Sequence, residues 1–188
     1  LLFTTFLRCM AVGNLTVKLL DEGVHSGDAS GIVPSSFRII RELLSRIEDE
    51  ETGRVLVEGL HVEIPEERMA QAAKVAEVLG DEVYSKFPFL DGMTPRADDL
   101  TELVLNRTWR PALSITGADG IPPLASAGNV LRPHTALKLS MRLPPTLDGK
   151  RGGELLERAL LDDAPYGAEV SLHLEKASTG WNAPSLAP

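Results

Sequence analysis

The sequence has one cysteine, few aromatic residues and no long apolar run. Cys9 is alone among 188 residues, so no internal disulfide can form, and we expect a reducing, cytoplasmic compartment. The longest apolar runs are far too short to span a bilayer. The apolar start Leu1–Leu7 has no basic region before it and no small-residue cleavage site after it, so we expect neither a signal peptide nor a membrane partner.

Positive charge is also in short supply. The chain has 19 Lys and Arg against 27 Asp and Glu, a net charge of -8, and only 5% aromatic residues. An acidic surface argues against nucleic acid as a partner, and a sheet without stacking aromatics argues against an RNA-recognition domain. Hydrophobic residues at 43% are ordinary for a soluble globular domain with a real core.

Motifs for metal or phosphate chemistry are missing as well. There is no His-Glu-x-x-His and no glycine-rich phosphate loop of the usual kinds. His173 and Glu175 share one strand face and could touch one metal, but we interpret them as solvated polar residues. Cys9 has no activating neighbours and is predicted to be a small core residue. We therefore expect no metal site in this chain.

Alternating apolar and polar residues predict four strands. The runs that alternate are Leu15–Leu19, Leu113–Thr116, Leu137–Leu143 and Val170–Glu175. The third is the longest clean alternation. A loop of glycine and small residues, Gly23–Gly31, follows the first strand.

Two helices are predicted between these strands. Pro34 opens the first, where its missing N–H is tolerated, and apolar steps of three and four predict one buried face made by Phe37, Ile40, Leu44 and Ile47. The acidic run Glu48–Glu51 is interpreted as its solvated end. The second helix is predicted over Gly152–Leu161, with its inward residues being Leu155, Ala159 and Leu160.

Residues from about 52 to 110 are predicted to form a helical insertion. Pro65 begins one helix, followed by acidic residues suited to the positive end of its dipole, and Gly80 ends it. Asp98-Asp99 begins a second, shorter helix. Without the insertion the order is β-α-β-β-α-β.

This order predicts an α+β fold, a ferredoxin-like sandwich with two helices on one face of an antiparallel sheet. We treat residues 1–188 as one domain with the insertion. The other face of the sheet would carry polar residues: Lys138, Ser140, Arg142, Ser171 and His173. That face would be open to something outside the domain.

Three segments resemble one known family. Leu15–Phe37, with His25-Ser-Gly after the first strand and a helix opened by proline, is similar to the start of the lid (dimerisation) domain of M20 metallopeptidases. Gly128-Asn129-Val-Leu-Arg-Pro133 and the strand ending Met-Arg-Leu-Pro-Pro145 resemble the family's Asn-to-Arg segment. Thr4–Arg8 and Gly180–Pro184 resemble the points where the chain leaves and re-enters the catalytic domain. The long insertion resembles the carnosinase-like dipeptidase branch.

The resemblance implies a function for the parent protein. M20 enzymes hydrolyse dipeptide-like amide bonds with two metal ions, usually zinc, bound by a catalytic domain that this chain lacks. A glutamate of that domain acts on a metal-bound water. The lid is expected to form a homodimer and to supply His25 to the oxyanion, in the other subunit's active site. Asn129 and Arg142 would bind substrate, with Arg142 suited to its carboxylate. The fragment alone would be inactive.

One alternative remains open from the residues. Both ends of the sequence look like cuts in a longer chain, which fits the lid interpretation. A stand-alone ferredoxin-like regulatory or dimerisation module that binds a small ligand is the other interpretation, and it predicts natural ends close to Leu1 and Pro188.

Overall fold

A four-stranded antiparallel sheet forms the centre of the protein, seen in a computed structural model that describes residues 6–183. The strand order is β4-β6-β2-β7. Its strands are β2 (Cys9–Lys18), β4 (Ala112–Asp119), β6 (His134–Leu143) and β7 (Glu169–Ser178). This order and the antiparallel pairing are those of the predicted ferredoxin-like α+β fold, which is confirmed. Thr4, Thr5 and Pro184 of the predicted domain junctions lie outside the described residues.

The remaining elements surround this sheet. The helices are α1 (Ser26–Ala29), α2 (Ser36–Ser45), α3 (Glu66–Leu79), α4 (Glu82–Ser85), α5 (Leu100–Thr108) and α6 (Gly149–Leu161). Short 3-10 turns are η1 (Glu58–Leu60), η2 (Leu124–Ser126) and η3 (Pro165–Gly167). Two small ladders pair β1 (Phe6–Leu7) with β8 (Trp181–Asn182) and β3 (Val24–His25) with β5 (Val130–Leu131). No helix in the described part is long and apolar enough to cross a membrane.

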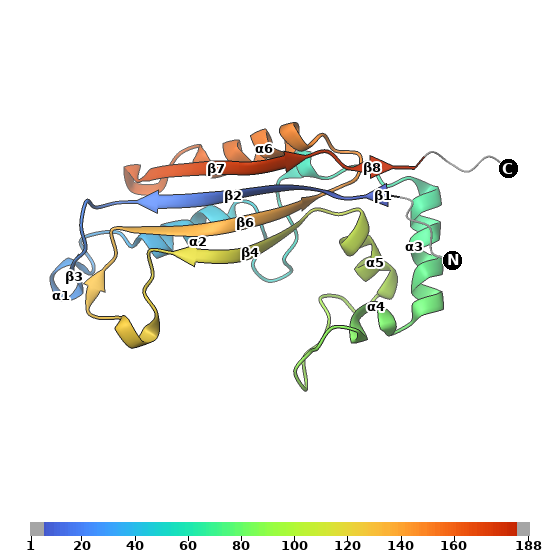
Figure 1. Cartoon of the computed structure of the whole chain (residues 1–188), viewed down its shortest axis with the longest axis horizontal. Coiled ribbons are helices and arrows are strands. Elements are labelled where there is room, and N and C mark those ends of the chain that lie inside the picture. Colours follow the sequence, from blue (N-terminus) through green and yellow to red (C-terminus); the bar gives the residue numbers. More distant parts are fainter. Residues whose placement is uncertain (1–5, 184–188) are drawn as a thin grey trace.

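Helices α2 and α6 cover one face of the sheet (Figure 1). Strands β2 and β6 bury every second side chain beneath them, because successive residues of a strand point to opposite faces. Cys9 is buried at the start of β2, as predicted, and burial raises the pKa of its thiol. The core is therefore one layer between sheet and helices.

The buried stripe of α2 differs from the prediction at one end. Ile39, Ile40 and Leu43 are fully buried, whereas Phe37 is 46% exposed and Leu44 only half-buried. The prediction that Phe37 belongs to the buried face was wrong. Ser36 takes the inward position instead, where its hydroxyl bonds to Thr135, and the next residue along a helix points about 100° away.

Helix α6 begins three residues earlier than predicted, at Gly149. Asp148 caps it by accepting a hydrogen bond from the Arg151 N–H, which lowers the pKa of that carboxyl. A Cβ at Gly149 would lie 2.4 Å from the Ser178 carbonyl oxygen, and one at Gly152 would lie 2.6 Å from Leu143. The two glycines allow α6 to pack closely on the sheet.

Helices α3, α4 and α5 of the predicted insertion have a small core of their own. Ala72, Ala76, Val104, Leu105 and Trp109 are among its buried members. The segment before them behaves differently, since Val55 and Leu60 join the main core. The three helices lie beside β1 and β8, at one end of the molecule (Figure 1). Arg68 of α3 is buried and donates to the Ala183 carbonyl, which ties α3 to the chain after β8.

The second face of the sheet has no helix over it and carries the polar residues that were predicted there. Lys138 and Ser140 are half-exposed, and Arg142, Ser171 and His173 are exposed.

Candidate functional site

His25 sits at a corner formed by β3 and the short helix α1. Its partner in the ladder is Val130, and the Ser26 N–H donates to the Asn129 carbonyl at 3.0 Å. The side chain of His25 is 64% exposed, and its Nδ1 lies 3.7 Å from an Asp28 carboxylate oxygen. The ring is therefore presented to solvent and oriented by one acidic neighbour.

Gly27 explains why the His-Ser-Gly sequence ends in glycine. A Cβ at this position would lie 2.7 Å from Cε1 of the His25 ring and 3.0 Å from Nδ1. These distances are shorter than ordinary van der Waals contact, so any larger residue would push the ring away. Glycine lets the imidazole lie against the backbone of α1.

Asn129 is brought beside His25, although 104 residues separate them in the sequence. The β3–β5 ladder places them on neighbouring segments, and both are exposed. The exposed loop that carries Asn129 also holds Leu124, which is 96% exposed. This corner thus combines two hydrogen-bonding side chains with an apolar loop.

Arg142 lies at the opposite end of the sheet from the His25 corner. It pairs with Met10 and Ala112 near the end of β6, whereas His134 at the start of β6 lies near the corner. Strands rise roughly 3.3 Å per residue, so the eight residue steps from His134 to Arg142 span about 26 Å. Figure 1 shows β3 and β1 at opposite ends of the molecule. One subunit therefore cannot bring Arg142 and His25 to one small ligand.

The open face of the sheet, which has no helix over it, also carries an ion pair that reaches from β6 across β2 to β7. Lys138 on β6 donates to both carboxylate oxygens of Glu175 on β7, at 2.8 and 2.7 Å, and Asn14 on β2 donates at 3.0 Å. The bond from Lys138 is the main reason that the pKa of Glu175 is lowered. Glu175 is thus engaged by Lys138 and Asn14.

Metal ligands do not gather in the described part of the chain. Residues 6–183 contain no group of three or more His, Cys, Asp or Glu side chains placed to hold a metal ion. The remaining histidine of interest, His61, bonds through Nε2 to the Val55 carbonyl at 2.7 Å. The residues here do not fit a metal centre, so their chemistry is that of hydrogen-bond donors and charges.

Sequence reasoning did not single out Arg8 as a site residue. Arg8 is half-buried close to Arg142, and its two terminal nitrogens donate to the carbonyls of Arg107 and Arg110, at 2.7 Å each. These partners are 99 and 102 residues away, so no local pattern could reveal them.

The fold is that of a ferredoxin-like α+β domain, and it carries an exposed polar corner at His25 and Asn129. The chain belongs to the peptidase dimerisation domain family of the M20 peptidases, whose model matches residues 11–168. A comparison with curated proteins finds no significant match.

Solved structures with the same fold include two dipeptidases and one carboxypeptidase. Human carnosine dipeptidase 1 is 23% identical, with a TM-score of 0.74, over 96% of this chain and 39% of that one. The dipeptidase Dug1p of Saccharomyces cerevisiae is 19% identical, with a TM-score of 0.73, over 96% and 38%. The M20 metallo-carboxypeptidase Sso-CP2 of Sulfolobus solfataricus is 20% identical, with a TM-score of 0.66, over 90% and 38%. This chain spans about two fifths of the length of these relatives.

Proposed function

We propose that this chain is the lid domain of a metal-dependent M20-type peptidase that hydrolyses dipeptide-like amide bonds as a homodimer. The family match supports an M20 dimerisation domain, and the names of two similar structures support dipeptides as the substrate class. A separate catalytic domain would bind two divalent ions, zinc in the first instance, which polarise the amide carbonyl and activate water. The lid would contribute donors and charge.

His25 is proposed to stabilise the oxyanion that forms when the amide is attacked. An Asp28 carboxylate oxygen lies 3.7 Å from Nδ1 of the ring, and an imidazole nitrogen that carries hydrogen is a hydrogen-bond donor. With Nδ1 turned toward Asp28, Nε2 is left to donate to the oxyanion. A hydrogen bond to a charged oxygen is shorter and stronger than one between neutral groups. This bond would form where the transition state gains negative charge.

Asn129 and Arg142 are proposed to bind substrate at different places. Asn129 lies next to His25, so its amide can donate to the same region of the substrate. Arg142 is exposed at the far end of the sheet and has no carboxylate partner among residues 6–183. A guanidinium suits a substrate carboxylate, because its planar donors match the two oxygens.

The distance between these residues supports an active site shared by two subunits. The separation of about 26 Å or more along the sheet is too long for one dipeptide. In a symmetric dimer, His25 and Asn129 of one lid would reach the catalytic centre of the twin, where the twin's own Arg142 holds the substrate. This separation within one fold is the observation that carries the two-subunit proposal.

Mixed dimers of the full-length protein test the shared site. We expect His25→Ala and Arg142→Ala homodimers each to lose most activity. In a heterodimer of the two, one site would combine an intact His25 with an intact Arg142, and the other would lack both. Random mixing should therefore restore about one quarter of the wild-type sites.

The same mixture separates the two arrangements. If His25 and Arg142 served one site from the same subunit, each site in the heterodimer would lack one of them and mixing would restore nothing. Mixing each variant with itself is the matched control. Metal content and sedimentation of both variants should equal those of the wild type, so that lost activity reports the lid residues alone.

A further inference from the structure

Arg8 has an unusual set of partners. It lies one residue before β2 and next to β1, where its guanidinium is half-buried. Nη1 donates to the Arg107 carbonyl and Nη2 to the Arg110 carbonyl, and Nε is buried without a hydrogen-bond partner among the described residues. Backbone carbonyls, which carry no net charge, are thus its hydrogen-bond acceptors.

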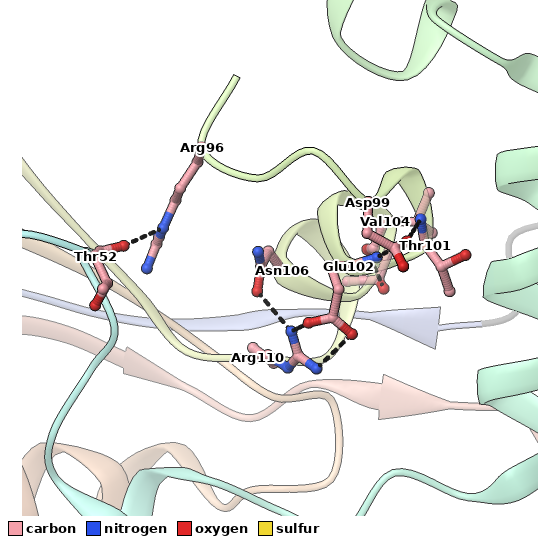
Figure 2. A network of polar contacts seen from close by, with 9 residues as sticks. Thr52, Arg96, Asp99, Thr101, Glu102, Val104, Asn106 and Arg110 are labelled. Atoms are coloured by element: carbon pink, nitrogen blue, oxygen red, sulfur yellow. Dashed lines mark hydrogen bonds and ion pairs between the residues drawn. The ribbon is translucent and has the colours of Figure 1, made fainter. Parts of the chain in front are cut away.

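The C-terminal end of α5 holds Arg8 in place. The last carbonyls of a helix lack partners within it and carry the negative end of its dipole, so they attract a cation. The side chain of Arg110 is itself fixed, because it donates to both carboxylate oxygens of Glu102 and to Asn106 (Figure 2). The helical insertion therefore sets the position of Arg8 on the sandwich.

Arg8 and Arg142 form a pair of cations without a counter-ion. Neither has an ion pair with a carboxylate among residues 6–183. Met10, two residues after Arg8, is paired with Arg142 across β2 and β6, so Arg8 and Arg142 lie at the same end of neighbouring strands. Burial, together with the charge of Arg142, lowers the pKa of Arg8 to about 10, so Arg8 stays positive at neutral pH. Two uncompensated charges at one place attract an anion more strongly than one.

We propose that Arg8 is a positioning residue for a substrate carboxylate bound at Arg142, fixed there by the end of helix α5. This inference rests on the proposed function. Arg8 has its terminal nitrogens occupied, so it acts through its charge: it turns the exposed Arg142 guanidinium away from itself, toward solvent, and adds to the positive potential there. The pair selects peptides that end in a free carboxylate over peptides that end in an amide.

The test compares two substrates of the full-length enzyme, a dipeptide and the same dipeptide with its C-terminus amidated. Arg8→Gln should raise KM for the free acid about tenfold, because one unit charge near the carboxylate is lost from a partly buried place. The kcat for the acid and the kcat/KM for the amide should hold. Arg8→Lys, which keeps the charge, should restore part of the preference. Lys150→Gln, which removes an exposed charge on α6 at the other face of the sheet, should not change it.

Each outcome has one meaning. If Arg142→Gln leaves the preference for the free acid intact, the proposed role of Arg142 fails and this inference with it. If Arg142→Gln removes the preference but Arg8→Gln does not, the inference alone is overturned. Equal losses on both substrates would assign Arg8 a purely structural role and also overturn it. Should Arg8→Gln not fold, Glu102→Gln carries the test, since loosening Arg110 should produce a smaller shift in the same preference.

Discussion

The side chain of His25 is exposed, and the neighbouring residues Gly27 and Asp28 orient it. Gly27 leaves room for the ring against α1, and Asp28 lies 3.7 Å from Nδ1. The Ser26 N–H bonds to the Asn129 carbonyl and fixes the corner to the loop across from it. An exposed but oriented donor is what a group serving a neighbouring subunit requires.

Removing the imidazole should slow the proposed reaction without disturbing the protein. We expect His25→Ala in the full-length enzyme to lower kcat by about 10²–10³, the usual effect of losing one oxyanion donor. Steady-state kinetics at saturating substrate measures this. Thermal stability should hold, since the side chain is 64% exposed. A variant with full kcat would remove His25 from the mechanism.

Gly27→Ala provides a second test of the same corner, because it keeps the imidazole but moves it. The added Cβ would meet the ring at 2.7 Å. A fall in kcat with little change in KM would indicate that ring placement matters.

At the scale of single elements, a glycine is required for close packing of the strands in β2 but not in β4. β2 and β4 each contain a glycine at an irregularity of register, Gly13 and Gly117. A Cβ at Gly13 would lie 2.6 Å from the His173 carbonyl oxygen, whereas one at Gly117 would lie 3.5 Å from the nearest atom, Cβ of Lys138. The first contact is with backbone and cannot relax easily, and the second is ordinary van der Waals contact.

These two glycines form a matched pair for a stability measurement. Gly13→Ala should lower the free energy of unfolding by about 1–3 kcal/mol, because the central pairing of β2 with β7 has to shift. Gly117→Ala should be close to neutral or slightly stabilising, since alanine restricts the unfolded chain more than glycine does. Urea unfolding of both variants checks the difference. Equal effects would contradict the packing argument.

For the whole molecule, the two edges of the sheet differ in how they are protected. β7 carries the charged residues Glu169, Glu175 and Lys176, which discourage pairing with another strand. β4 has no charge before Asp119, is mostly exposed, and presents Ile115 at 44% exposure. Helix α2, with Phe37 exposed, covers the neighbouring strand β6. In the proposed homodimer, β4 is therefore the edge that we expect the twin to cover.

A charge on that edge should separate the subunits. Ile115→Lys should raise the dimer dissociation constant at least about tenfold, because pairing would bury an unpaired ammonium group. Sedimentation velocity over a range of concentrations measures it, and circular dichroism should show an unchanged fold. Ser171→Lys on β7 is the control. If Ser171→Lys dissociates the dimer and Ile115→Lys does not, the twin covers the other edge.

Local patterns were enough to predict most elements but not their ends. The alternation in Leu137–Leu143 predicted the core of β6, because a half-buried strand must alternate. β2 was predicted from Leu15 but begins at Cys9, since the apolar residues Met10 and Val12 on its open face hide the alternation. Phe37 was wrongly predicted to point inward in α2, because a hydrophobic pattern favours a bulky apolar residue over the neighbouring serine. In the structure Ser36 is buried and Phe37 is exposed.

The sequence by itself determined the α+β class, the order of elements and the polar second face, since these follow from periodicities of a few residues. It also carried the His-Ser-Gly and Asn-to-Arg segments. Only the tertiary structure decided that His25 meets Asn129, that Arg142 lies at the far end of the sheet, and that Arg8 reaches the end of α5. The contacts of the His25 corner and of Arg8 join segments about a hundred residues apart, and the position of Arg142 follows from strand register. Register and close packing are not encoded in any local pattern.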